Sequence, residues 1–357
     1  MSHNTLIGWD IGGAHLKAAV INSAGQLQGV YQQPCPLWQG LQHLQQAVAH
    51  IQQHIADDKP LHALTMTGEL VDLFADRDDG VRQILATMAS LLGLQPVWVF
   101  AGVAGFLPLA AVNSSHYAAI ASANWLASAT YTALAVGDGL FVDIGSTTTD
   151  ILVLKQAQVV TQAYTDYQRL QTKELVYTGV VRTAVMAVAH TAIDKGQEIG
   201  LMAEYFATMA DVYRVTLELD ELHDQTDTAD GAEKSVLASA RRLSRMLGSD
   251  FVPEDLPRWR QFAQQIRAQQ LQKIHHACVQ HIATKGLADH SPMIGAGVGR
   301  FLVRQLADTL GRPYIDFTAL LPSAECPTGL TAADCAPAVA VAYLANFRHP
   351  DTRQSNE

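Results

Sequence analysis

The stretches that decide the fold are DIGGAHLK at residues 10–17 and DIGSTTTD at residues 143–150, which repeat one pattern about a third of the chain apart. In each, an apolar run ends in an aspartate, glycine interrupts the run, and small and apolar residues then alternate. This order predicts a strand, a tight turn and a second strand. Backbone N–H groups in such a turn can converge on an anion, and a strand-end aspartate can hold hydrated Mg²⁺. Two facing copies would bind a polyphosphate from both sides.

The rest of the chain fits an α/β fold built from two similar halves. Apolar runs typical of strands cover residues 6–11, 16–21, 27–31, 62–67 and 97–100. Helical periodicity over 41–55 and 81–91 and an alanine-rich segment at 115–134 predict helices. A second unit restarts at Leu140 with strand, turn and strand, followed by a third strand near 159–163. The repetition predicts two halves that face a central cleft.

These patterns set the expected domain boundaries. The first domain is predicted over 1–137 and the second over 138–347, with a mostly helical insertion at about 198–285. The polar segment 223–231 interrupts this insertion and predicts a loop that starts a helix near Ala232. The last helix, 336–347, is able to pack back on the first domain. Residues 348–357 are expected to form a flexible tail.

Composition limits the classes of function. A chain of 357 residues, 48% apolar and 16% charged, is long enough for two well-filled cores, and its formal net charge of −10 argues against nucleic acid as a partner. Residues 83–137 lack Asp, Glu, Lys and Arg, but Pro and Gly interrupt the apolar part, which argues against a membrane span. No signal-peptide pattern precedes the first strand. We therefore expect a cytoplasmic protein. Neither a zinc site nor a disulfide framework is suggested by the cysteines at Cys35, Cys278, Cys326 and Cys335.

The two glycine turns supply most of the candidate ligand-binding residues. Taken singly, each strand-end aspartate is better explained by turn capping, but the shared offset of the two favours cation binding. Lys17 could reach a phosphate as a point charge, or it is a solvated strand residue. The candidate metal ligands are Asp10 and Asp143. The candidate phosphate-binding residues are Gly12, Gly13, Ala14 and Lys17 in the first turn and Gly145, Ser146, Thr147 and Thr148 in the second.

A third glycine turn, GAGVG at residues 295–299, ends a predicted strand and opens a helix. Asp316 lies at a distance that suits a dinucleotide-binding unit, but Arg300 occupies the place of the third glycine of that motif. We interpret the segment as a turn that borders an adenosine-like or phosphate pocket. Its candidate binding residues are Gly295, Gly297 and Gly299.

Together, the paired aspartate turns and the late glycine turn resemble the superfamily of actin, sugar kinases and Hsp70, in which two ribonuclease-H-like domains clamp a metal-bound nucleotide. Within it, the chain resembles the hydantoinase A/oxoprolinase-related proteins of tetrahydromethanopterin-linked one-carbon metabolism, whose archaeal members include a synthase of the methanofuran core. The segments that support this resemblance are DIGG at 10–13, MTGEL at 66–70, ASANW at 121–125, residues 142–151, LVYTG at 175–179 with Arg182 and Thr183, EYFA at 204–207 and DTADG at 227–231.

The resemblance implies a transferase that joins an aminomethylfuran-methyl diphosphate to the phenol of a tyramine-derived acceptor, with loss of diphosphate. The product would be a precursor of methanofuran or, in a methylotroph, methylofuran. Mg²⁺ is the implied cofactor, ATP is a second candidate ligand, and a homodimer is compatible with the sequence. Because a phenol has a reference pKa near 10, its attack needs a base. The candidate catalytic residues are Glu69, which we prefer, Asp166, Asp227 and Asp230; the last two could instead pair with the substrate's ammonium group.

Two other functions use the same expected cleft. One is an ATP-dependent small-molecule kinase or amidohydrolase, in which the turn at 295–299 borders adenine and Glu69 activates a hydroxyl or water. The other is a nucleotide-sensing protein without catalysis, whose halves close on ATP. Formation of ADP would favour the former, and ligand-driven closure without turnover the latter.

Overall fold

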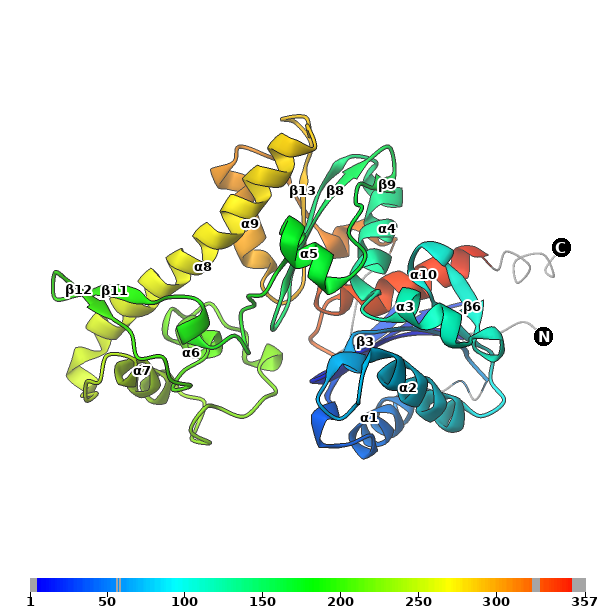
Figure 1. Cartoon of the computed structure of the whole chain (residues 1–357), viewed down its shortest axis with the longest axis horizontal. Helices are drawn as coiled ribbons and strands as arrows, with labels where there is room; N and C mark the ends of the chain where they lie inside the picture. The colour runs from blue at the N-terminus through cyan, green and yellow to red at the C-terminus, as the bar shows by residue number, and fades with distance from the viewer. Residues whose placement is uncertain (1–4, 56, 58, 323–327, 349–357) are drawn as a thin grey trace. The chain divides into compact units, whose positions relative to one another are not determined.

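Two large sheets form the framework of the chain (Figure 1). The structure is a computed structural model that describes residues 5–55, 57, 59–322 and 328–348. Numbered within each sheet, both have the order 3-2-1-4-5, and the first adds a sixth strand at its edge. This is the ribonuclease-H-like α/β topology, and it confirms the two-fold repetition predicted from the sequence. Cys326 and residues 349–357 of the expected tail lie outside the described residues.

The first sheet combines antiparallel and parallel strands. Strands β1, β2 and β3 pair antiparallel, whereas β4 is parallel to β1 and β5 is parallel to β4. Nearly all of β1 and β4 is buried, as expected for central strands of a covered sheet. The bounds are β1 Thr5–Ile11, β2 His15–Asn22, β3 Leu27–Pro34, β4 Leu61–Met66, β5 Val97–Phe100 and β6 Phe106–Pro108.

Helices pack on this first sheet through close, apolar contacts. Helix α2 begins where the Asp76 carboxylate accepts a hydrogen bond from Asp79 N at 2.8 Å, and it ends at Gly93, whose φ is 61°. Helix α10 approaches β1 so closely that a Cβ at Gly8 would lie 2.1 Å from Ala338 O. The helices of this unit are α1 Gln42–Gln52, α2 Arg77–Leu92, α3 Tyr117–Ile120, α4 Asn124–Val136 and α10 Ala336–Arg348.

The second sheet has the order β10-β8-β7-β13-β14, with β9 paired to β8. The third strand expected at 159–163 is only the short β9, because Ala163 N turns back to donate to Thr161 Oγ1 at 3.0 Å. The third position of the sheet is taken instead by β10. The bounds are β7 Gly139–Ile144, β8 Thr149–Lys155, β9 Gln158–Val159, β10 Leu175–Val176, β13 Met293–Ala296 and β14 Tyr314–Asp316.

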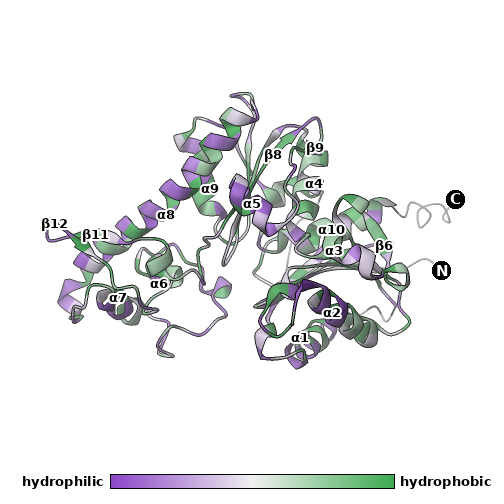
Figure 2. Ribbon diagram, in the orientation of Figure 1, coloured by the Kyte–Doolittle hydropathy of each residue, from purple (hydrophilic) through white to green (hydrophobic). Residues whose placement is uncertain are grey.

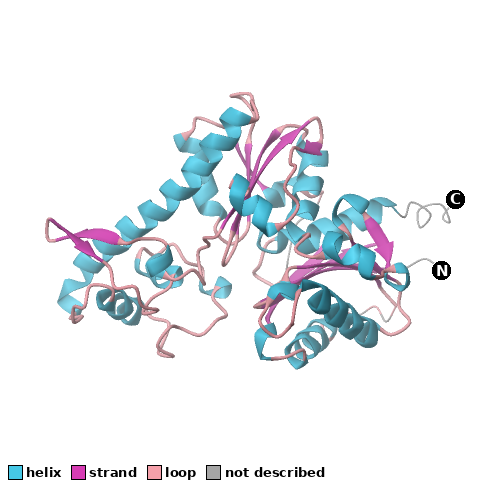
Figure 3. Cartoon of the chain, in the orientation of Figure 1, coloured by secondary structure: helices cyan, strands magenta, loops and turns pink. Residues whose placement is uncertain are grey.

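The expected insertion is helical but contains long loops, especially between α6 and α7 (Figure 3). Its longest element, α8, has 29 residues and is largely hydrophilic along its length (Figure 2). Its buried side includes Trp259 and Phe262. The remaining bounds are α5 Asp166–Thr172, β11 Thr191–Asp194, β12 Gln197–Gly200, α6 Met209–Val215, α7 Val236–Arg245, α8 Leu256–Thr284 and α9 Arg300–Thr309.

The structure divides the chain differently from the boundary expected at residues 137 and 138. The first unit comprises Met1–Asp138, Leu154–Asp166 and Asp316–Glu357, and the second comprises Gly139–Val153 and Tyr167–Ile315. Two segments that we placed in the second domain are grouped with the first, and the later one contains the last helix, whose packing on the first domain is as expected. The physical reason for the later one is α10, whose alanine-rich surface is buried against β1. Within the described residues, every helix is too short or too polar to cross a bilayer.

Candidate functional site

The first glycine turn presents Asp10 at the carboxyl end of β1. Gly12 N donates to His15 O at 3.0 Å and closes the turn, while Thr67 N donates to Ile11 O at 3.0 Å. The second bond links the end of β1 to the segment that leaves β4. Asp10 is 6% exposed, and one carboxylate oxygen accepts from Asn124 Nδ2 at 3.3 Å. The strand ends therefore place Asp10 beside the exit of β4, where ligands of α/β folds gather.

A break in an expected helix completes this site. The sequence predicts one helix over 115–134, but α3 ends at Ile120 and α4 begins at Asn124. Between them Ser122 has φ 50°, a left-handed conformation that is uncommon for residues other than glycine. The break lets Ser122 Oγ donate to Glu69 Oε1 at 2.6 Å, two residues before Asn124 contacts Asp10. One short loop thereby contacts both acids.

Glu69 is the most unusual acid of the first unit. It lies in the 3₁₀ turn η2, Gly68–Leu70, with only 1% of its surface exposed. Within the described residues, its Oε2 atom is buried and has no hydrogen-bond partner. Burial raises the pKa of the Glu69 carboxyl, and the Ser122 hydroxyl opposes that rise. A buried carboxylate with one unused oxygen and a raised pKa is suited to accept a proton.

Asp166 lies beside Glu69 but is already ion-paired. Its Oδ2 atom is 2.5 Å from Arg77 Nη2 and 3.3 Å from Ser122 Oγ. The structure thus brings two predicted catalytic acids, Glu69 and Asp166, to one serine hydroxyl. Sequence reasoning missed Arg77 as a partner, and it quoted Ser122 only within the segment at 121–125. The left-handed backbone at Ser122 has no sequence signal, because serine rarely adopts it.

The second glycine turn is closed by the same kind of backbone hydrogen bond as the first. Gly145 N donates to Thr148 O at 2.8 Å, at the offset seen between Gly12 and His15. Within the described residues, Ser146 Oγ is buried and has no hydrogen-bond partner. Asp143 lies at the end of β7, next to this turn and opposite Ala296 of β13. The second unit therefore repeats the arrangement of strand-end aspartate and turn.

The turn at 295–299 packs against the end of β7. Gly297 has φ 77°, and a Cβ there would lie 2.3 Å from Asp143 Oδ1. Gly299 N donates to Ile144 O at 2.8 Å, and a Cβ at Gly295 would lie 2.7 Å from the Tyr314 ring. Close packing thus accounts for all three glycines. Their role in nucleotide or phosphate binding stays a prediction.

Three other predicted residues have structural partners. Lys17 Nζ donates to Asp334 O at 2.7 Å. Asp230 accepts from Arg242 Nη1 at 3.0 Å and from Arg245 Nη1 at 2.9 Å. Burial acts to raise the pKa of Asp230, but the Ala232 N–H and these arginines outweigh it and lower that pKa. Asp227 is exposed in the loop before α7. The proposed roles of Lys17, Asp227 and Asp230 remain predictions.

The donors available for a cation are single carboxylates. Within the described part of the chain, no group of three or more His, Cys, Asp or Glu side chains is arranged to hold a metal ion. Asp10 and Asp143 each offer one carboxylate at a strand end. Mg²⁺ is commonly bound by one or two carboxylates together with water and substrate phosphates, so this donor chemistry fits a cation that arrives with its phosphate ligand.

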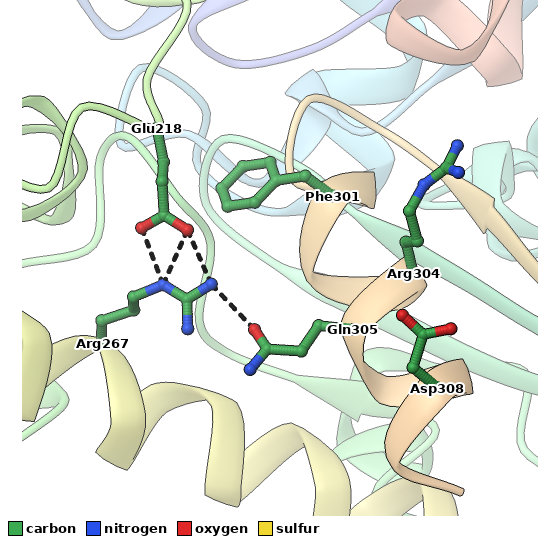
Figure 4. Close-up of a pocket in the computed structure, with 6 residues that line it drawn as sticks. All are labelled: Glu218, Arg267, Phe301, Arg304, Gln305 and Asp308. Atoms are coloured by element: carbon green, nitrogen blue, oxygen red, sulfur yellow. Dashed lines mark hydrogen bonds and ion pairs between the residues drawn. The ribbon is translucent and has the colours of Figure 1, made fainter. Parts of the chain in front are cut away.

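A surface hollow of about 430 Å³ lies elsewhere, in the second unit (Figure 4). Arg267 on α8 pairs with Glu218 at 2.7 Å and donates to Gln305 on α9 at 2.8 Å. Because these groups satisfy one another, the hollow has a structural explanation as a link between α8, α9 and the turn after α6. None of the residues predicted from the sequence lines it.

Comparison with known proteins identifies relatives across most of the chain. The family model described as hydantoinase/oxoprolinase matches residues 61–339. The (4-{4-[2-(gamma-L-glutamylamino)ethyl]phenoxymethyl}furan-2-yl)methanamine synthase of Methanocaldococcus jannaschii is 32% identical over 246 residues, which cover 69% of this chain and 72% of that protein. The synthase of the same name from Methanococcus vannielii is 33% identical over 111 residues, covering 31% of this chain and 50% of that protein.

A solved structure shares the fold at much lower identity. Nucleotide-free acetone carboxylase aligns with a TM-score of 0.58 and 10% identity, over 95% of this chain and 70% of that chain. At this identity the likeness concerns the fold alone, so it supports the architecture and leaves the chemistry to the sequence relatives and the site.

Proposed function

Because the chain belongs to the hydantoinase/oxoprolinase family, we propose that it is a transferase that forms the phenoxymethylfuran linkage of methanofuran or methylofuran. The substrates would be an aminomethylfuran-methyl diphosphate and the phenol of a tyramine-derived acceptor. The observation that carries the proposal is the 32% identity over 72% of a synthase whose name specifies this linkage. The reaction would make the protein an enzyme of one-carbon metabolism.

In the proposed reaction, the phenol oxygen bonds to the furfuryl carbon while the bond from that carbon to the diphosphate oxygen breaks. The electron pair of the broken bond leaves with diphosphate, and the phenolic proton goes to a base. The furan oxygen delocalises positive charge at the reacting carbon, so the bond to diphosphate can break early. The protein then has to position the phenol and exclude water, which would compete as a nucleophile.

Glu69 is the residue that we propose as the base. Within the described residues the Glu69 Oε2 atom has no hydrogen-bond partner and provides a site for the proton, and burial raises the pKa of the Glu69 carboxyl, which makes the carboxylate a stronger base. Asp166 is less suited, since Arg77 holds its carboxylate at 2.5 Å. Asp230 is likewise paired with two arginines. The contacts therefore favour Glu69 over these two acids.

Anion binding is proposed for the second glycine turn. The amide groups of residues 146–148 and Ser146 Oγ would donate to the leaving diphosphate, and Asp143 would hold its Mg²⁺. When bound, Mg²⁺ would stabilise the negative charge that develops on the diphosphate. The turn itself orients the departing group before reaction, and preorganised amide donors of this kind require little rearrangement as the bond breaks.

The test is product analysis by mass spectrometry. Purified protein with Mg²⁺, the furan diphosphate and γ-glutamyl-tyramine should yield the coupled ether and one diphosphate per ether, with ATP neither required nor consumed. A parallel reaction contains ATP in place of the furan diphosphate. Absence of the ether together with formation of ADP would replace the proposal by a kinase or amidohydrolase activity. Absence of both would leave it without enzymatic support and contradict it.

A further inference from the structure

The second glycine turn is held from one side by a segment that the sequence did not assign to the site. Val180 N donates to Gly145 O at 3.1 Å, Arg182 N to Ser146 O at 2.9 Å, and Thr183 Oγ1 to Thr147 O at 3.2 Å. Three successive carbonyl groups of the turn thus point toward residues 180–183. Gly179 permits this approach, since a Cβ there would lie 2.4 Å from Thr147 N.

The geometry of the peptide bond then fixes the direction of the amide groups. In a trans peptide, the N–H points opposite to the carbonyl of the same plane. The N–H groups of residues 146–148 therefore point away from the segment 180–183, and within the described residues none of them has an acceptor. Ser146 Oγ is buried there without a partner. Consecutive unpaired amide groups of this kind form an anion-binding concavity.

Arg182 adds a fixed positive charge next to these amide groups. Its Nη1 atom donates to Thr147 Oγ1 at 3.4 Å, and the side chain is only partly buried. The segment that carries it is anchored, because Gln270 of α8, which is fully buried, donates to Thr178 Oγ1 at 2.7 Å and to Gly179 O at 2.8 Å. A guanidinium on such a support binds phosphate oxygens with a defined geometry.

The geometry points to Arg182 as a binding residue for one phosphoryl group of a diphosphate ester, which it contacts together with the amide groups of residues 146–148. This inference deepens the proposed function and rests on it for the identity of the ester. The binding of a diphosphate group itself needs only the residues named here. Arg182 places a positive charge beside this turn, and its planar donors distinguish it from a lysine.

The experiment measures binding of inorganic diphosphate to the full chain by calorimetry, with and without Mg²⁺. Arg182→Gln should weaken binding about 10- to 100-fold, the loss expected for a charge-assisted hydrogen bond to phosphate. The affinity of Arg182→Lys for diphosphate should lie between that of Arg182→Gln and that of the unchanged protein. Arg241→Gln on α7 removes the same charge from an exposed residue and should leave binding unchanged. Equal binding by Arg182→Gln and Arg241→Gln would overturn the inference.

A second variant separates ligand contact from support of the turn. Thr147→Val removes the hydroxyl that accepts from Arg182 but retains the amide group, so binding should weaken less than about 3-fold. If Thr147→Val weakened binding as much as Arg182→Gln, Arg182 would act by holding the turn, and the inference would fail. Because the readout is diphosphate binding, the inference stands or falls separately from product formation. Loss of binding in Arg182→Gln without any coupled ether would overturn only the proposed transferase.

Discussion

The two glycine turns share a closure but not a chemical environment. Gly12 N bonds to His15 O in the first and Gly145 N to Thr148 O in the second, so the backbone device is the same. Around the first lie Asp10 and the acids held by Ser122, whereas the second adjoins hydroxyl groups and Arg182. The repeated strand order thus supports one turn suited to proton transfer and another suited to anion binding.

The difference between the surroundings of the two glycine turns arises in segments outside the repeated strand–turn–strand unit. At the first turn, the chemistry comes from the break at residues 121–123 and from η2; at the second, it comes from residues 178–183. The segment after β3 also holds the first turn, since Cys35 N donates to Ala14 O at 2.8 Å and Leu37 N donates to Gly13 O at 3.0 Å, but this segment reads Cys35, Pro36 and Leu37 and carries no charge. The duplicated fold therefore fixes where the two turns lie, while the connecting segments decide which side chains surround each turn.

Loss of the proposed base should have the largest effect. Glu69→Gln should lower the turnover of the coupling reaction by about 10²- to 10⁴-fold, the usual contribution of a general base. Glutamine keeps the shape and the acceptor for Ser122 Oγ but cannot take the proton. Steady-state kinetics would measure this, with Glu198→Gln on the exposed hairpin as the control. Full turnover by Glu69→Gln would contradict the proposal that the first turn serves proton transfer while the second binds the anion.

The buried charges of the helical region should matter for folding rather than for turnover. Asp211, 1% exposed, accepts from Arg242 Nε and Ser239 Oγ, each at 2.8 Å. Asp211→Ala should lower the free energy of unfolding by about 3 kcal/mol, because it leaves the buried Arg242 Nε without its acceptor while Asp230 still pairs with Arg242 Nη1. Glu221→Ala removes an acid of the same network that is 54% exposed and should change it by less than about 1 kcal/mol. Urea titrations would compare the two, and equal effects would contradict the expectation.

The packing beneath Glu69 gives a smaller expected change. A Cβ at Gly80 of α2 would lie 2.4 Å from Glu69 O, so either the helix or η2 must move in Gly80→Ala. We expect a loss of about 1–3 kcal/mol in the free energy of unfolding, typical of overpacking, and reduced turnover. Gly200→Ala is the matched control, since nothing lies near the added methyl group. Thermal unfolding of both variants would show whether Gly80 is required.

The serine that contacts both acids should shift the pH profile. Its hydroxyl lowers the pKa of Glu69 against the effect of burial, so Ser122→Ala should raise that pKa further. Because a base must be deprotonated, the acidic limb of the profile of kcat/KM against pH should move to higher pH. Turnover at neutral pH should fall about 10-fold, the effect of one hydrogen bond to a charged group. An unmoved limb would mean that Ser122 only supports the loop.

The smallest expected effects concern how the free energy of unfolding changes with pH. The contributions of Glu69 in the first unit and Asp230 in the second have opposite signs. Glu69 has a raised pKa in the folded state, so its contribution is present below its ordinary pKa of 4.5 and is lost as the pH rises through the raised value. Asp230 has a lowered pKa, so its contribution is present above 3.8 and is lost as the pH falls through the lowered value. Unfolding of Glu69→Gln and Asp230→Asn measured across pH 3–8 would test both signs.

Much of the fold was predictable because it depends on local patterns. Strands at 6–11, 16–21 and 97–100 and the turns at 10–17 and 143–150 follow from apolar runs and glycines, which act over a few residues. The same logic was wrong about one helix over 115–134. Alanine favours helix throughout that segment, but the tertiary contacts of Ser122 with Glu69 and of Asn124 with Asp10 accompany a break. Propensity is a weak preference that such contacts override.

The sequence by itself determined the repeated strand and turn order, the two strand-end aspartates and the family, since each is written in consecutive residues. Only the tertiary structure decided that Glu69 is buried with one oxygen that has no partner among the described residues. The same holds for the pairing of Asp166 and Asp230 with arginines and for the position of Arg182 beside Thr147. These pairings join residues 12 to 89 positions apart. They depend on how elements pack, which no local pattern specifies.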